Sequence, residues 1–172
     1  MLESSDYSAK DNSYAYICCN PIAKFYVKKN TLFTEYPDGS KFQKEITEDI
    51  RIFSELEKFM NKFSIHDDSN QSKKYISKGL FGYMTYDSVR FFEKININNE
   101  SFGDDIPDIY YSLYSEIIVV NTFNNEATLI SHSVNKNKND EIEKLIKGKK
   151  TNEFRFKLKG KLESNLTDDE FL

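Results

Sequence analysis

The segment at positions 79–93 reads GLFGYMTYDSVRFFE, and the period of its side chains changes halfway along. Leu80 to Tyr86 alternates as a strand does when one of its faces is buried. Asp87 belongs to the residue types that cap helices, and after it Val89 and Phe92 fall on one side of a helical turn. The segment therefore predicts a strand that leads directly into a short helix.

Three residues of this segment have predicted packing roles. Gly82 carries no Cβ, so a neighbouring backbone or side chain can come close to the strand at that point. We expect Tyr83 and Tyr86 to fill the interface between the sheet and the short helix, which also carries Arg90 and Glu93. Packing is the favoured role of this element, ahead of ligand binding.

Upstream of this segment, the sequence predicts a meander of strands followed by one helix. The strands are expected at 13–19, 23–28, 31–36 and 41–46, with Asn20-Pro21 and Pro37-Asp38-Gly39 as turns. Apolar residues then fall on one helical stripe between Thr47 and Phe63, and Thr47 can serve as the N-cap. One amphipathic helix is therefore expected to pack on the sheet.

Downstream, a hairpin and a polar carboxyl-terminal region are predicted. A long strand at 109–122 and its partner at 127–134 flank a turn at Asn124-Asn125, and a polar linker with a short helix at 136–150 precedes a strand at 154–162. The pattern as a whole predicts an α+β fold with a mostly antiparallel sheet and a few packed helices. The last residues, from Thr167 to Glu170, have the spacing of a capping box, so the chain is expected to stop at the entrance to a second domain.

Composition excludes several classes of protein. The chain has 172 residues, of which 15% are Phe or Tyr, so it has enough large apolar groups for a folded core. No apolar run approaches the roughly 18 residues that a membrane span needs, and no export leader opens the chain. A net charge of -4 gives no broad electrostatic footprint for nucleic acid.

The residues that most often carry chemistry are sparse. Cys18 and Cys19 are adjacent, which excludes a loop-closing disulfide between them on a strand, and we interpret them as thiols in a reducing cytoplasm. His66 and His132 lack the spacing of metal ligands. No phosphate loop and no nucleophile beside a histidine base is found. We predict no catalytic residue, no metal ligand and no activity for this chain alone.

Two segments together resemble the amino-terminal domain of anthranilate synthase component I. The resemblance rests on Met1-Leu2-Glu3-Ser4 followed by Lys10, on the Gly-Tyr-x-x-Tyr-Asp-x-x-Arg-x-x-Glu element at 82–93, on Asp105-Ile106-Pro107-Asp108 and on Ser164-Asn165-Leu166-Thr167. It departs from the family at Met1, where the family has a leucine, and the catalytic domain is missing. The resemblance implies a regulatory domain at 1–163 and a stub of the chorismate-binding domain at 164–172.

The resemblance also implies an activity for the complete protein. With a glutamine amidotransferase subunit, an enzyme of this family converts chorismate and ammonia into anthranilate and pyruvate in the cytoplasm, and it uses Mg2+ that the absent domain binds. What this domain contributes is one wall of the feedback pocket for L-tryptophan. Carried over by position, the residues of that wall are Leu2, Glu3, Ser4 and Lys10.

Two alternatives stay open. Component I of aminodeoxychorismate synthase, an enzyme of the folate pathway, shares the domain plan, although the Leu-Glu-Ser segment with Lys10 fits the tryptophan-regulated enzyme better. The other alternative is a non-catalytic interaction module whose sheet docks a partner protein.

Overall fold

The computed structural model describes residues 13–47, 49–64, 75–76, 78–95 and 106–132, the backbone of 2–4, and positions 142, 144, 147, 148 and 159. The chain divides into two compact units, Met1–Asn139 and Asp140–Leu172, and the helices and strands below all lie in the first. Nearly all of the strand predicted at 154–162, the capping box and the domain boundary predicted after residue 163 lie outside the described residues. No helix among the described residues is long and apolar enough to cross a membrane.

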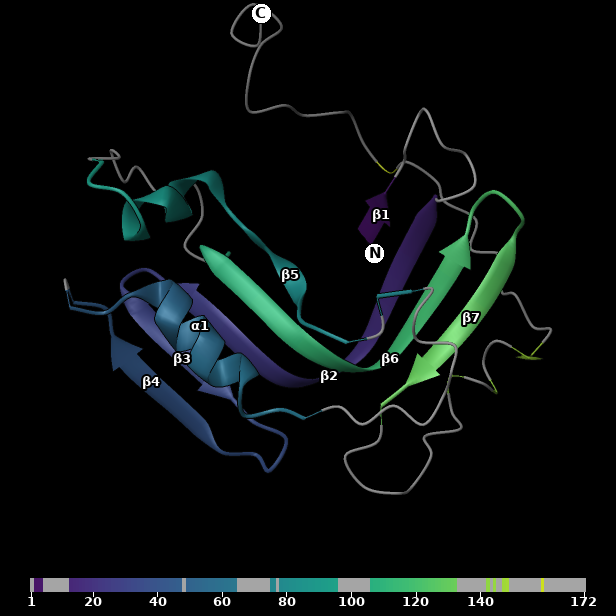
Figure 1. Cartoon of the computed structure of the whole chain (residues 1–172), viewed down its shortest axis with the longest axis horizontal. Helices are drawn as coiled ribbons and strands as arrows, with labels where there is room; N and C mark the ends of the chain where they lie inside the picture. The colour runs from purple at the N-terminus through teal and green to yellow at the C-terminus, as the bar shows by residue number, and fades with distance from the viewer. Residues whose placement is uncertain are drawn as a thin grey trace, which may run out of the picture. The chain divides into compact units, whose positions relative to one another are not determined.

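Two long antiparallel strands, β2 (Tyr14–Lys28) and β6 (Ile109–Asn121), form the centre of the sheet (Figure 1). Shorter strands flank them: β1 (Leu2–Ser4) and β3 (Thr31–Glu35) on β2, β4 (Lys41–Glu45) on β3, and β5 (Phe81–Met84) and β7 (Glu126–Ser131) on β6. Each long strand thus has different neighbours at its two ends. Every pairing among these seven described strands is antiparallel, which confirms the predicted fold class.

The prediction of a turn at Asn20-Pro21 is wrong, because β2 runs through both residues. Asn20 has a φ of 56°, and the register with β6 shifts between Pro21 and Ala23, so that Ile22 is an extra residue in β2. This is a β-bulge, which bends a strand without reversing it. Pro21 has no N–H to donate, and a bulge is one of the few places in a sheet that tolerate proline.

The other two predicted turns are confirmed. Gly39 has a φ of 84°, and its N–H donates to the carbonyl of Tyr36 at 2.9 Å, which closes the hairpin between β3 and β4. Asn125, in the hairpin between β6 and β7, has a φ of 57°. Both positions carry residue types that adopt the left-handed region at low cost.

The predicted amphipathic helix is present but shorter than its sequence pattern. Helix α1 spans Ile52–Met60, with Arg51 rather than Thr47 at the N-cap position. The N–H of Ile46 is bonded to the carbonyl of Asn30 at 2.7 Å, and the N–H of Ile50 is bonded to the carbonyl of Thr47 at 2.9 Å, so an isolated turn at Thr47 precedes α1. Helix α1 lies over β2 and β3 (Figure 1). Its residues Ile52 and Phe59 are buried in the main core.

The segment that follows β5 is a 3-10 helix, η2 (Tyr86–Phe91), which replaces the helix predicted after an Asp87 cap. Thr85 is its N-cap residue and Asp87 lies within its first turn. The hydroxyl of Ser88 donates to the carbonyl of Thr85 at 2.6 Å. The N–H of Thr85 is bonded to Asp108 at 2.8 Å, which ties this point to the start of β6 and fixes where the helix begins.

Tyr83 and Tyr86 do not fill the interface between sheet and helix, and that prediction is wrong. Their exposed fractions are 41% and 88%. Tyr83 lies opposite Tyr110 on the face of the sheet that points away from the main core. There it ends a row of rings that crosses β3, β2, β6 and β5 and consists of Phe33, Tyr26, Tyr110 and Tyr83, with centroid spacings of 4.9, 6.3 and 6.0 Å.

Candidate functional site

The predicted ligand segment lies on the edge of the sheet. Leu2, Glu3 and Ser4 form β1, where they lie opposite Tyr16, Ala15 and Tyr14 of β2. The backbone of the three predicted residues is therefore held in a fixed register. Lys10, the fourth predicted residue, lies outside the described residues. The role of all four in binding tryptophan stays a prediction.

The strand that pairs with β1 carries a cluster of aromatic side chains. Tyr14 contacts Tyr75 edge to face at 5.5 Å, and Tyr16 lies 5.9 Å from Phe81. These rings pack with the buried side chains of Ile117 and Val119 from β6. The cluster is a second core on the sheet, separate from the one beneath α1.

The polar atoms of this cluster are neutral groups. Burial raises the pKa of the Tyr114 hydroxyl, and the nearby Tyr110 raises it further. Burial also raises the pKa of the Cys18 thiol. The Tyr16 hydroxyl accepts a hydrogen bond from the N–H of Ile76 at 3.4 Å. At neutral pH the cluster therefore offers hydroxyl donors and acceptors and a protonated thiol, which suits binding better than acid-base chemistry.

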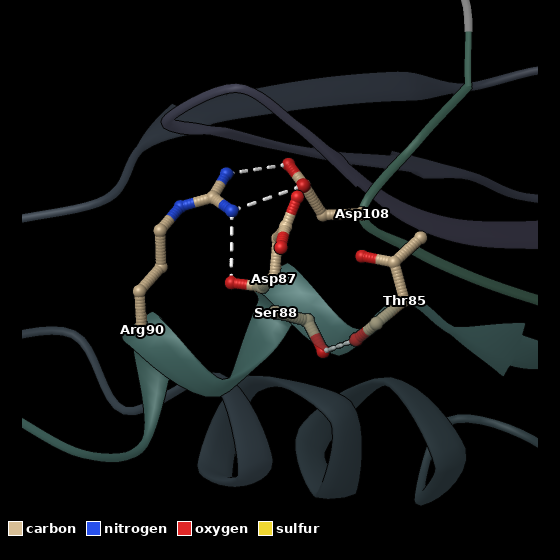
Figure 2. A network of polar contacts seen from close by, with 5 residues as sticks. All are labelled: Thr85, Asp87, Ser88, Arg90 and Asp108. Atoms are coloured by element: carbon tan, nitrogen blue, oxygen red, sulfur yellow. Dashed lines mark hydrogen bonds and ion pairs between the residues drawn. The ribbon is translucent and has the colours of Figure 1, made fainter. Parts of the chain in front are cut away.

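An ion pair connects two of the sequence landmarks. Figure 2 shows the Arg90 guanidinium reaching Asp108 with both terminal nitrogens, at 3.1 and 2.7 Å, while one of them also donates to the carbonyl of Asp87 at 2.9 Å. Both charged side chains are 17% exposed. The pair joins η2 to the residue before β6, so it is a structural clamp. Sequence reasoning noted both landmarks without pairing them, because 18 residues separate them along the chain.

Comparison with known proteins finds a structural likeness. No protein-family model and no curated protein match the sequence. Among solved structures, the crystal structure of anthranilate synthase component I from Streptococcus pneumoniae TIGR4 matches 86% of this chain with a TM-score of 0.51. The chain has a related fold. The two sequences are 15% identical, and the chain spans 30% of the length of that protein, so the likeness concerns the architecture alone.

The fold also contains a buried carboxylate that the sequence did not predict. Glu116 of β6 is 2% exposed, and its Oε2 accepts hydrogen bonds from Asn20 at 2.8 Å and from the Ser115 hydroxyl. Asn20 sits at the β-bulge, so its unusual backbone directs a donor to the carboxylate. The signal available in the sequence was a glutamate directly before the apolar run Ile117–Val120.

The cysteines and histidines take no part in a cluster of metal ligands within the described part of the chain. Cys18 and Cys19 are both free and half-buried. The ring Nδ1 of His132 lies 3.1 Å from the carbonyl of Tyr114, next to the hairpin of β6 and β7. His66 lies outside the described residues.

Proposed function

We propose that this chain is the amino-terminal, tryptophan-sensing part of an anthranilate synthase component I. The proposal is supported by the order of the sequence landmarks and by the related fold, which extends over 86% of the chain. The observation that carries it is the position of β1: the Leu2–Ser4 segment pairs with Tyr14–Tyr16, at the margin of the aromatic cluster.

The chemistry of a tryptophan site fits the residues of this region. A free amino acid brings an ammonium, a carboxylate and, here, an indole ring, so its site needs acceptors, donors and an apolar slot. Glu3 would offset the ammonium, Ser4 would donate or accept through its hydroxyl, and Lys10 would attract the carboxylate. The aromatic cluster beside Tyr16 would supply the slot for the ring.

The complete protein would act with a glutamine amidotransferase subunit to convert chorismate and ammonia from glutamine into anthranilate and pyruvate. In our proposal that chemistry belongs to a chorismate-binding domain, and this chain alone is inactive. The proposal assigns the binding of Mg2+ to the catalytic domain as well.

Feedback inhibition would be a coupling between two distinct sites. Tryptophan bound between this domain and the catalytic domain would stabilise an inactive arrangement, and the coupling would equal the difference in its affinity for the two arrangements. The row of rings from Phe33 to Tyr83 lies on the sheet face away from α1 and includes the exposed Tyr83. The proposal assigns part of this face to contact with the catalytic domain.

The isolated chain is expected to bind tryptophan weakly or not measurably, because it holds only one wall of the pocket. Isothermal titration calorimetry of the 172-residue chain with L-tryptophan tests this directly. Binding in the low micromolar range would contradict the shared pocket, whereas its absence together with binding by the two-domain protein would support it.

In the two-domain protein, Ser4→Ala is expected to weaken inhibition by tryptophan by about tenfold or more, since losing a charge-assisted hydrogen bond costs about 1.5 to 3 kcal/mol. Ser54→Ala is the matched control, because Ser54 is exposed on α1. Equal inhibition constants for the two variants would show that Ser4 does not contact tryptophan.

A second experiment concerns the reaction product. An assay of the two-domain protein for anthranilate against aminodeoxychorismate separates the proposed enzyme from the folate-pathway alternative.

A further inference from the structure

A groove of about 250 Å³ lies between α1 and the hairpin of β3 and β4, on a part of the domain separate from β1. Its floor contains the buried side chains of Leu32 and Phe59, which are 4% and 2% exposed. The rings of Tyr36 and Phe42 form its wall and meet edge to face at 5.9 Å. Phe42 is 61% exposed, so an aromatic surface of the groove faces solvent.

Three lysines and one glutamate line the same groove. Lys44 and Lys58 approach the same oxygen of Glu55, at 3.3 and 3.0 Å. The hydrogen bond from Lys58 lowers the pKa of Glu55, and partial burial does not offset it, so this carboxylate is ionised at neutral pH. One carboxylate thus faces two ammonium groups.

A third lysine, Lys62, also lines the groove. Lys62 lies over the ring of Tyr36, with its Nζ 4.4 Å from the ring centroid and 3.0 Å from the hydroxyl. Lys62 lies beyond the end of α1 at Met60. Hydrogen bonds from Ser40 and the charge of Lys62 lower the pKa of Asp38, so this carboxylate is also ionised at neutral pH. Three lysines thus meet two carboxylates, and one positive charge is left in excess. An anion bound in the groove would neutralise this charge.

We propose that this groove binds a small aromatic carboxylate. Its volume lies below the roughly 300 to 1,000 Å³ of sites for drug-sized ligands, which favours a ligand with one ring. The ring packs on Phe42 and Tyr36, and the carboxylate lies between the Nζ atoms of Lys58 and Lys62. Glu55 competes with the ligand for Lys58. This site is independent of the proposed tryptophan pocket and does not rest on it.

Benzoate is the probe, and the readout is the change in amide chemical shifts of the whole chain in two-dimensional NMR spectra. We expect saturable shifts confined to β3, β4 and α1. Benzylamine, which has the same ring with a cation, and acetate, which has the anion without the ring, are expected to cause no saturable shifts there. Raising the salt concentration is expected to weaken the binding of benzoate.

Removing a lysine and removing the glutamate are expected to change benzoate binding in opposite directions. Lys58→Gln is expected to weaken benzoate binding by roughly two- to fivefold, the range for one exposed charge pair. Glu55→Gln is expected to strengthen it by a similar factor, because the competing carboxylate is lost. Lys94→Gln, at an exposed lysine outside the groove, is the matched control and should leave the affinity unchanged.

Three results would overturn the proposal: no saturable shift with benzoate, equal shifts with benzylamine, or weaker binding in Glu55→Gln. A loss of folding in Lys58→Gln would be recognised from the dispersion of its spectrum. Glu55→Gln and the salt dependence then still decide the question, since both are measured without the Lys58 variant.

Discussion

Gly82→Ala is expected to destabilise the domain by roughly 3 kcal/mol or more. A Cβ at this position would lie 1.8 Å from the carbonyl oxygen of Tyr110 and 2.7 Å from the Cα of Tyr111. Both are backbone atoms of β6, so no side chain can move aside and β5 itself would have to shift. The free energy of unfolding in urea, compared with that of the unaltered chain, measures the effect.

Gly39→Ala is the control for this substitution. Gly39 has a φ of 84°, and no atom lies within 4 Å of the position a Cβ would take there. Its replacement adds backbone strain of about 1 to 2 kcal/mol without a collision. If Gly82→Ala lost no more stability than Gly39→Ala, the close approach of β5 to β6 would be refuted.

Arg90→Ala is expected to cost about 2 to 4 kcal/mol, because it leaves the carboxylate of Asp108 mostly buried without its cation. Arg90→Lys keeps the charge and loses the two-pronged geometry, so its cost should be intermediate. The effect should appear in urea unfolding and in faster amide exchange at η2, which the ion pair joins to the start of β6.

An exposed pair provides the comparison for Arg90. Lys41 lies 3.3 Å from Glu35, but its side chain is 70% exposed, so Lys41→Ala should cost less than about 1 kcal/mol. A double-mutant cycle with Arg90→Ala and Asp108→Asn isolates the coupling between the two charges. A coupling as small as that of the exposed pair would show that the clamp adds little to stability.

Much of the sheet was predictable because its signals are local. The period-two alternation placed β3, β4 and β6 within a residue of their observed bounds, and Gly39 and Asn125 marked the hairpins through their backbone freedom. The core positions Ile52 and Phe59 followed from the helical stripe. Each of these signals arises within a few neighbouring residues.

Two predictions made from local composition were wrong, the turn at Asn20-Pro21 and the N-cap at Thr47. Asn20-Pro21 has the composition of a turn, and it becomes a bulge because both halves of β2 pair with β6, about 95 residues away. Thr47 has the chemistry of an N-cap, but it opens an isolated turn to Ile50, and α1 begins only after Arg51. At Asn20-Pro21 a contact with another segment overrides the local preference.

The candidate site, too, was predictable from the sequence only in part. The Leu2–Ser4 motif and its resemblance could be recognised in the sequence, whereas the pairing of this motif with Tyr14–Tyr16 and its place beside the aromatic cluster required the folded sheet. The ion pair between Arg90 and Asp108 and the groove between α1 and the β3–β4 hairpin could not be predicted from the sequence either, since their residues come from separate elements.

The sequence by itself determined the α+β class, the alternating strands, the apolar stripe of α1 and the two hairpin turns, because dihedral preferences and side-chain periodicity act over a few residues. The tertiary structure alone decided where β2 bends, where each helix begins, which tyrosines are exposed and which charges meet. Those outcomes depend on the register between strands that are distant in the chain, and burial and hydrogen bonding fix that register only when the whole sheet forms.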